Sequence, residues 1–321
     1  MLTYLGRRAL YAIPIILVAS FLTFAFVRAT FDPTAKLRQS REAASAIRAE
    51  RARLGLNQPL VEQYGTWLGR FLRGDWGTSE RTREAVSSQI GRALGNTAQL
   101  VVWGVLVAAV AAVAIGVYSA LRQYSVFDYT FTGLSFIGLA LPPFWFGLLA
   151  IEFLAVGPKQ WFHLSEPPLF FINLHSSSGG ALDYARHLVL PVLTLTVQII
   201  AGWSRFQRAS MLDVMSSSYI RTARAKGVPR RRVVLRHGLR NALIPLVTVM
   251  ALDIGALFGG LIITEKIFSI PGMGKLFLDS LLAGDATTLT AWLVVTAAFI
   301  VACNLLADVA YGWLDPRIRL A

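Results

Sequence analysis

Long blocks of uncharged, mostly apolar residues constrain the fold of this chain more than any other feature. The first block, residues 9–27, contains nineteen uncharged residues, and a helix of about 20 residues crosses the hydrocarbon core of a bilayer. Further blocks cover residues 97–121, 129–156, 188–203, 242–264 and 289–314. Because lipid offers the backbone no hydrogen-bond partner, segments of this length cross it as helices. The pattern therefore predicts an all-α membrane protein with six transmembrane helices.

The charge content agrees with a membrane protein. Only 15% of the residues are charged, whereas soluble domains carry about 25%. The formal net charge is +13, and the basic residues lie between the apolar blocks, as they do in the loops of membrane proteins. We therefore expect contact with membrane lipid and no binding of nucleic acid. The single cysteine, Cys303, excludes an intrachain disulfide.

The blocks divide the chain into three regions. Residues 1–27 are expected to form an N-terminal transmembrane helix, because a cleaved signal peptide has an apolar region of only about 7–15 residues. Residues 28–96 are expected to form a long extracytoplasmic segment, and residues 97–321 a core domain with the remaining spans and a cytoplasmic loop at 205–240. Within this core, the prolines at 142 and 143 predict a bend in the third span.

Two stretches of the 28–96 segment have a composition that predicts local structure. Residues 35–54 have alternating charges typical of a solvated helix. Residues 65–77 mix Trp67, Phe71 and Trp76 with basic side chains. This mixture fits a segment that lies at the membrane interface, and it equally fits an ordinary packed loop.

Basic residues in short loops predict the orientation of the spans. With the N-terminus inside, the four inner segments carry 2, 1, 10 and 2 basic residues, while the two short outer loops carry two each. The 28–96 segment carries twelve basic and seven acidic residues, but loops longer than about 60 residues largely escape the rule. The distribution predicts that both termini lie inside.

The loop at 205–240 is the most basic part of the chain, with ten basic residues and one acid. Ser218 is suited to cap the start of a helix, and Gly227 followed by Pro229 is suited to end it. The loop therefore predicts a short helix at 219–226 on the cytoplasmic face. Such a helix would either anchor the loop to anionic lipid or dock a soluble cytoplasmic motor.

Six stretches of the sequence, two of which begin in this loop, resemble the permease subunits of ABC importers for dipeptides and oligopeptides, the peptide/nickel family, and most of all their dipeptide B-type subunit. The matching stretches are YIRTARAKG (219–227), RHGLRNALIP (236–245), LGLNQPL (54–60) with Gln63 and Tyr64, LRGDWG (72–77), EKIFSIPGMG (265–274) and DPRIR (315–319). They follow the order of the family and cover nearly the whole chain. The resemblance implies the type I importer fold in a bacterial cytoplasmic (inner) membrane.

One position departs from the general pattern of this family. The ABC-permease loop begins with Glu-Ala-Ala and has a glycine six residues after the glutamate. Here Arg221 and Thr222 stand at the first two positions, while Ala223 and Gly227 match. The departure concerns the individual contacts with the ATPase rather than the place of the helix.

The resemblance also implies the partners. The family works with a second permease subunit, here expected as a heterodimer, with ABC ATPase subunits and with an extracytoplasmic substrate-binding protein. The loop helix would fit a groove of the ATPase. The residues expected to couple it are Tyr219, Arg221, Thr222, Ala223, Arg224, Ala225 and Gly227. The cargo would be a dipeptide or oligopeptide, with haem or a nickel chelate as alternatives.

The chain itself is not expected to be an enzyme or to hold a cofactor, since ATP and magnesium would bind to the partner ATPases. A phosphate-binding loop requires GxxxxGK[ST]. The stretch from Gly272 to Lys275 is similar, but Ser269 stands at the first glycine position and Leu276 replaces the magnesium-binding hydroxyl. We interpret this stretch as a turn.

Several polar or small residues lie within the predicted spans. Asp253 is near mid-membrane, where charges are costly and usually face a path or a partner. It would line the transport path or form an internal hydrogen bond between helices. Gly255 and Gly259 have a spacing that permits close helix approach, within the subunit or between two permeases. Gln198 would bridge helices.

Two further hypotheses remain open at this point. His163, His175 and His187 fall in or beside one outer loop. They would either bind a metal or haem or, like most histidines in loops, have no specific function. A self-contained secondary transporter or channel is the alternative function. It would need coupling acids in several spans, whereas Asp253 is the only central acid here.

Overall fold

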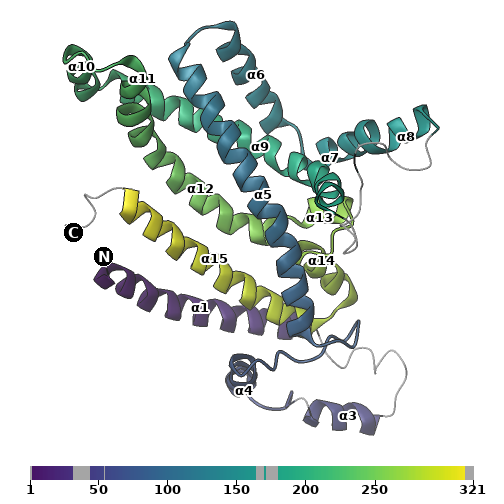
Figure 1. Ribbon diagram of the computed structural model, residues 1–321. Helices are drawn as coiled ribbons and strands as arrows, with labels where there is room; N and C mark the ends of the chain where they lie inside the picture. The colour runs from purple at the N-terminus through teal and green to yellow at the C-terminus, as the bar shows by residue number, and fades with distance from the viewer. Residues whose placement is uncertain (1, 32–43, 54, 164–169, 171–179, 315–321) are drawn as a thin grey trace.

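Five long helices and one bent helix pair form the core of the molecule (Figure 1). The computed structural model describes residues 2–31, 44–53, 55–163, 170 and 180–314. The five long helices are α1 (Leu2–Thr30), α5 (Val86–Leu121), α9 (Ala181–Ser216), α12 (Arg240–Gly260) and α15 (Ala286–Leu314). Each contains a stretch long and apolar enough to cross a membrane, and the bent pair counts as a sixth span. The prediction of an all-α membrane protein is confirmed.

The bent pair occupies the place of the third predicted span. Helix α6 (Val126–Ala140) is followed by α7 (Pro143–Ile151), which continues through the wider π-helical turn η1 (Glu152–Val156) into α8 (Gly157–Trp161). The two halves are bent by 101°. Proline lacks a backbone N–H and disfavours helical geometry in the residue before it. The consecutive prolines Pro142 and Pro143 therefore break the span rather than merely tilt it.

Helices α5 and α9 are longer than predicted. The apolar block at 97–121 covers the C-terminal part of α5, and the block at 188–203 covers the middle of α9. Each helix has 36 residues, which corresponds to about 54 Å. The additional residues include polar side chains, together with buried apolar ones such as Val86, Ile90 and Met211. Hydrophobicity alone therefore underestimated the length of the two helices.

Small residues let α5 and α9 pack closely along most of their length. The stripe Gly104, Ala108, Ala112 and Gly116 is buried and repeats at every fourth position. A β-carbon built on Gly116 would lie 2.7 Å from the β-carbon of Gln207. This close approach is the packing that small residues permit between helices in lipid. The pair forms the rigid centre on which α6, α7 and α12 pack.

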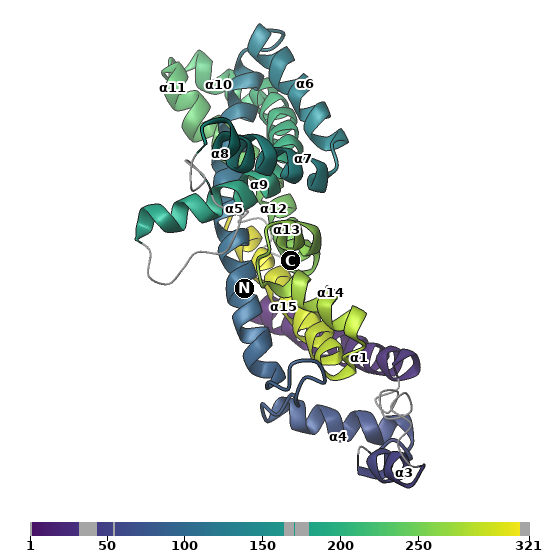
Figure 2. The same cartoon turned by 90° about the vertical axis from the view of Figure 1, so that its right-hand side faces the viewer.

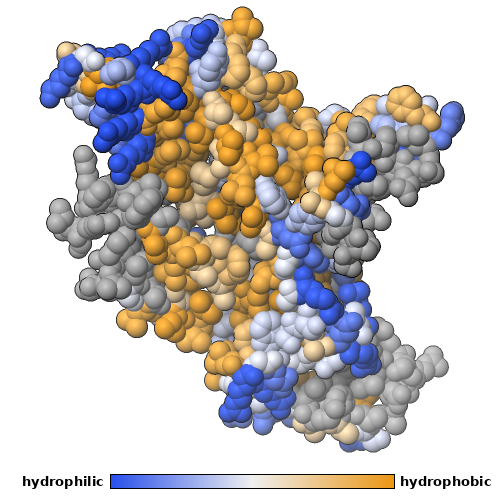
Figure 3. All heavy atoms as spheres, viewed as in Figure 1, coloured by the Kyte–Doolittle hydropathy of each residue, from blue (hydrophilic) through white to orange (hydrophobic). Residues whose placement is uncertain are grey.

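Short helices lie at both ends of the bundle. They are α3 (Ala44–Arg53), α4 (Leu60–Leu72), α10 (Ser218–Ala225), α11 (Arg230–Arg232), the π-helix η2 (Val233–Leu239), α13 (Ile262–Ile267) and α14 (Met273–Ala283). Helices α10 and α11 lie at one end, called the basic end below, and α3 and α4 lie at the opposite end (Figures 1 and 2). An apolar band separates hydrophilic surfaces at these two ends (Figure 3).

The beginning of α1 and the end of α15 lie side by side, on the side of the molecule that carries α10 (Figure 1). The two ends of the described chain thus share one side of the bundle, as an even number of crossings requires. Which side faces the cytoplasm stays a prediction at this point.

Helix α4 packs its aromatic face on α1. The Tyr64 ring lies edge-on to Phe21 at 5.2 Å, and the Tyr64 hydroxyl is 2.6 Å from the Ser20 hydroxyl. Trp67 contacts Phe24 with ring centres 5.5 Å apart. The aromatic side chains of this segment therefore serve helix packing.

Of the solvated helix predicted at 35–54, the described part is helical as α3, and residues 32–43 and 54 lie outside the described chain.

Candidate functional site

Helix α10 is the short helix that the basic loop predicts. It begins at Ser218, one residue earlier than expected, so the prediction that Ser218 caps the helix is wrong. Ser217 stands before the helix, and its hydroxyl does not cap an N–H of α10 but donates back to the carbonyl of Val214 at 2.6 Å. At its end, Gly227 has a φ of +75°, and the N–H of Val228 donates to the carbonyl of Ala223 at 3.2 Å. This is the glycine-terminated helix end that a left-handed residue permits.

One residue fixes α10 to the rest of the molecule. Ile220 is fully buried, and α10 packs against α9 and η2. The opposite face is open: Tyr219 is 44% exposed, Arg221 and Arg224 are exposed, and so are Thr222 and Ala225, while Ala223 is half-buried. The packing of one apolar side chain therefore orients the predicted coupling residues outward, into the hydrophilic surface of the basic end (Figure 3).

The segment after α10 is equally well packed. Val233, Val234 and Gly238 of η2 are buried. A β-carbon on Gly238 would lie 3.1 Å from the side chains of Met211 and Met215 on α9. Helices α11 and η2 thus lead into α12 without an interruption, and η2 closes the buried side of α10.

Asp253 joins α9 and α12. Its carboxylate accepts a hydrogen bond of 2.7 Å from the indole N–H of Trp203, which is 2% exposed. Asp253 is half-buried. Of the two roles considered for Asp253, the internal hydrogen bond between helices matches this geometry.

We expect Asp253→Ala to lower the free energy of unfolding by about 1–3 kcal/mol, because the buried indole N–H would lose its acceptor. Asp253→Asn keeps an acceptor oxygen and should cost less. Thermal unfolding of the purified protein in detergent measures both variants, and Asp213→Ala, at an exposed aspartate of the same helix α9, serves as the control. Equal effects of Ala and Asn at position 253 would contradict a hydrogen-bonding role.

Gly255 packs against α15 within the same subunit. A β-carbon there would lie 3.6 Å from the β-carbon of Cys303 and 3.7 Å from the side-chain oxygen of Asn304. The close approach that its spacing predicts is therefore made inside the chain. The surroundings of Gly259 lie outside the described part of the structure.

Gln198 bridges α9 to the break between α6 and α7. Its side-chain N–H donates to the carbonyl of Leu141 at 2.8 Å. Leu141 ends α6, and the prolines after it interrupt the helical hydrogen bonds. Gln198 therefore satisfies a backbone carbonyl that the broken helix leaves free, which a lipid environment would otherwise make costly.

A hollow of about 550 Å³ opens between α9 and α12. Its lining residues are Gly202, Arg205, Phe206, Ala209, Ser210, Asp213 and Pro245. The Arg205 guanidinium lies over the Phe136 ring at 4.4 Å. On its α12 side the hollow is lined by Pro245.

Sequence reasoning missed an ion pair between α6 and α9. Asp128 is 2% exposed, and its two carboxylate oxygens accept hydrogen bonds from Arg208 Nε and Nη2, each of 2.7 Å. The two residues of the pair are 80 positions apart in the sequence. The only signal for it was that both charges fall at the inner ends of neighbouring predicted spans.

Glu265 organises a second buried cluster, at the opposite end, which we call the Glu265 junction: Glu265, Thr97, Gly272, Met273 and Lys275. The carboxylate accepts hydrogen bonds from the Thr97 hydroxyl at 2.6 Å and from the N–H of Lys275 at 2.9 Å. The Thr97 hydroxyl accepts from the N–H of Met273 at 2.8 Å. Burial raises the pKa of Glu265, while these hydrogen bonds oppose the rise.

The Glu265 junction explains the stretch that resembles a phosphate-binding loop. A helix N-terminus attracts an anion, and here the carboxylate of Glu265 occupies that position at the start of α14. A β-carbon on Gly272 would lie 2.3 Å from this carboxylate. The stretch is therefore a helix start that binds an acid of its own chain.

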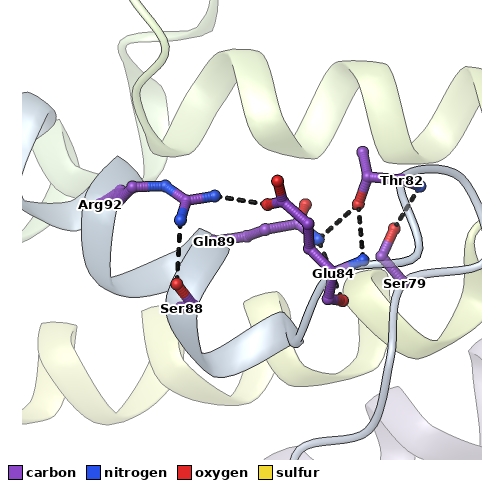
Figure 4. A network of polar contacts seen from close by, with 6 residues as sticks. All are labelled: Ser79, Thr82, Glu84, Ser88, Gln89 and Arg92. Carbon is purple, nitrogen blue, oxygen red and sulfur yellow. Dashed lines mark hydrogen bonds and ion pairs between the residues drawn. The ribbon is translucent and has the colours of Figure 1, made fainter.

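The turn before α5 is tied to α15 and to α5 itself. Ser79 donates to the buried carboxylate of Asp285, which precedes α15. Glu84 pairs with Arg92, and the Gln89 side chain donates to the Thr82 hydroxyl at 2.7 Å (Figure 4). A polar cleft of about 330 Å³ lies between this turn and α14. The 28–96 segment therefore contains a structured turn, and its last residues already belong to α5.

Two of the three outer-loop histidines lie in the part of the chain that the structure describes. His163 is exposed after α8, and the ring of His187 lies 2.8 Å from the carbonyl of Asp183. His175 lies outside the described residues. Within the described ranges, no group of three metal-ligating side chains occurs.

Two family models match this chain. Residues 112–320 match the binding-protein-dependent transport system inner membrane component, and residues 1–110 match the N-terminal region of such membrane components. Among curated proteins, the oligopeptide transport system permease protein AppB of Bacillus subtilis is 40% identical over 99% of this chain and 100% of its own length. The oligopeptide permease OppB of Mycobacterium bovis is 37% identical over the full length of both chains.

A third relative, the dipeptide transport system permease protein DppB of Escherichia coli, is 34% identical over 99% of both chains. All three relatives match from end to end, so the whole arrangement of spans and loops falls within the similarity. The resemblance inferred from the six motif stretches is thus confirmed for the family. The chain belongs to the inner membrane components of binding-protein-dependent transport systems.

Proposed function

We propose that this chain forms, with a second permease, the translocation path of an ABC importer for dipeptides or oligopeptides, and that α10 docks separate ATPase subunits. The observation that carries the proposal is α10, a helix ended by Gly227 and held by buried Ile220, with Arg221 and Arg224 outward. A helix that only contacted lipid would not need a fixed orientation. The relatives named for oligopeptide and dipeptide transport support the peptide cargo.

The proposal implies an orientation of the molecule in the membrane. The basic end would face the cytoplasm, as the distribution of Lys and Arg requires, and both termini would lie on that side. The opposite end, with the polar cleft beside α14, would then face the substrate-binding protein. The hollow between α9 and α12 would be part of the path that opens toward the cytoplasm.

The chemistry of the chain supports transport driven by separate subunits rather than self-contained secondary transport. A secondary transporter needs buried acids free to bind and release ions. The central acid Asp253 is engaged by Trp203 at 2.7 Å. ATP and magnesium would be bound by the partner ATPases, and α10 would transmit their closure to the spans as a rigid-body movement.

Reversal of both charges, Arg221→Glu with Arg224→Glu, is expected to abolish co-purification of the ATPase subunits and peptide uptake. Acidic groups on α10 would repel the carboxylates that arginines recognise. Uptake by reconstituted complexes and the subunit composition after purification measure the effect. The midpoint of thermal unfolding should not change, because both side chains are exposed.

The matched control is Arg70→Glu in α4 with Arg73→Glu directly after this helix, which has the same spacing, exposure and charge change at the opposite end. Unchanged ATPase binding after reversal at 221 and 224 would contradict docking at α10. Absence of ATPase subunits from the purified wild-type complex would contradict the importer itself.

A further inference from the structure

Helix α6 is held at both of its ends by side chains of α9. At its start, Arg208 makes two hydrogen bonds of 2.7 Å to Asp128, whose side chain is 3% exposed. At its end, Gln198 donates to the carbonyl of Leu141 at 2.8 Å. Arg208 and Gln198 are ten residues apart, which places them about 15 Å apart along α9. Two separated contacts fix both the position and the direction of α6.

The Arg208–Asp128 contact is the stronger of the two. A guanidinium and a carboxylate that meet through two parallel hydrogen bonds form a charge-assisted pair of fixed geometry. The backbone N–H of Tyr124 adds a third hydrogen bond to Asp128, at 3.0 Å. Because Asp128 is buried, loss of either partner would leave a charge without compensation. The contact therefore breaks only at a substantial cost.

Helix α9 is also joined to α10 without a flexible connection. Only Ser217 separates the two helices, and its hydroxyl is bonded to Val214 at 2.6 Å. Ile220 is buried on the side of α10 that contacts α9 and η2. A displacement of α10 must therefore move the end of α9 that carries Arg208.

We propose that Arg208 and Asp128 are positioning residues that pass the displacement of α10 through α9 to the broken span. This inference rests on the proposed function. In this mechanism, α6 follows the end of α9 because the ion pair holds them together. The break at Leu141 and Pro142 lets α6 change its angle to α7, which packs against α13 at the opposite end. The broken span thus converts movement at the basic end into a change beside the path.

Distance measurements between spin labels test this directly in the complete reconstituted complex. In a Cys303→Ser background, labels at Val126→Cys and Leu282→Cys report the start of α6 against the opposite end, and both positions are exposed. Labels at Ser216→Cys and Leu282→Cys report the end of α9. In the wild-type sequence, addition of ATP should change both distances.

Asp128→Asn and Arg208→Gln are each expected to keep the ATP-dependent change at position 216 and to lose it at position 126. Peptide uptake should fall at least about tenfold, which corresponds to about 1.4 kcal/mol of lost coupling. The double variant carries no unpaired charge and can form an amide–amide hydrogen bond, so it should recover the movement at 126 and most of the uptake. Arg122→Gln, in the exposed turn before α6, is the control.

Three outcomes overturn a proposal, and they can be told apart. If both single variants move and transport as the wild type does, the ion pair does not transmit movement. If a single variant loses movement at both 126 and 216, or the double variant recovers nothing, the residues serve the fold in general. If the wild-type complex shows no ATP-dependent change at 216, the proposed importer function fails instead.

Discussion

Alanine in place of Gly274 is expected to prevent most of the protein from reaching its folded state in the membrane. The added carbon would lie 2.5 Å from both the backbone nitrogen and the α-carbon of Ile262. Because these are backbone atoms, no side-chain rotation can relieve the overlap. Overpacking of this kind costs about 1–3 kcal/mol or more. The shift would also displace the N–H groups that bind the Glu265 carboxylate.

The folded fraction after purification and the midpoint of thermal unfolding measure this effect. Gly95→Ala on α5 is the matched control, because nothing lies within 4 Å of a β-carbon at that position and alanine favours the helix. Gly272→Ala should resemble Gly274→Ala, since its β-carbon would lie 2.3 Å from the Glu265 carboxylate. Wild-type stability of Gly274→Ala would show that the Glu265 junction can rearrange.

Ile220→Ala is expected to abolish transport while leaving the spans folded. Truncation of a buried isoleucine costs about 2–5 kcal/mol, and helices shorter than about 12–15 residues are marginal without tertiary packing. Helix α10 has 8 residues and buries only this side chain. Its loss should therefore release α10 from α9 and η2, and the ATPase subunits should no longer co-purify.

Peptide uptake and subunit composition give the functional result, and thermal unfolding shows whether the bundle remains intact. Ile263→Ala is the control, since it makes the same truncation at a side chain that is 49% exposed at the opposite end. Wild-type uptake by Ile220→Ala would mean that α10 does not need a fixed position.

The predicted elements that the structure confirms depend on local chemistry. Gly227 ends α10 because its positive φ suits glycine, and this can be seen in any sequence with a basic helix followed by Gly and Pro. Pro142 and Pro143 gave the break in the third span. The sequence predicts that the two prolines bend the span. The angle of 101° between its two halves depends instead on how each half packs against α9 and α13.

The contacts that were missed join residues far apart in the chain. Asp128 and Arg208 are separated by 80 residues, and Thr97 and Glu265 by 168. Each partner looks unremarkable in its own stretch of sequence: a charge near a span end, a threonine at a span start. Only the arrangement of the helices brings them within hydrogen-bonding distance.

The sequence by itself determined that this chain crosses a membrane as helices, that it carries a short basic helix ended by glycine, and that it belongs with importer permeases. These features follow from the apolar length that lipid demands and from the backbone preferences of glycine and proline, which act within a few residues. The tertiary structure alone decided that Asp253 is bound by Trp203, that Glu265 fills the start of α14, and that α9 holds both ends of α6. The reason is physical: a buried polar group is stable only beside a partner, and packing, not local sequence, supplies that partner.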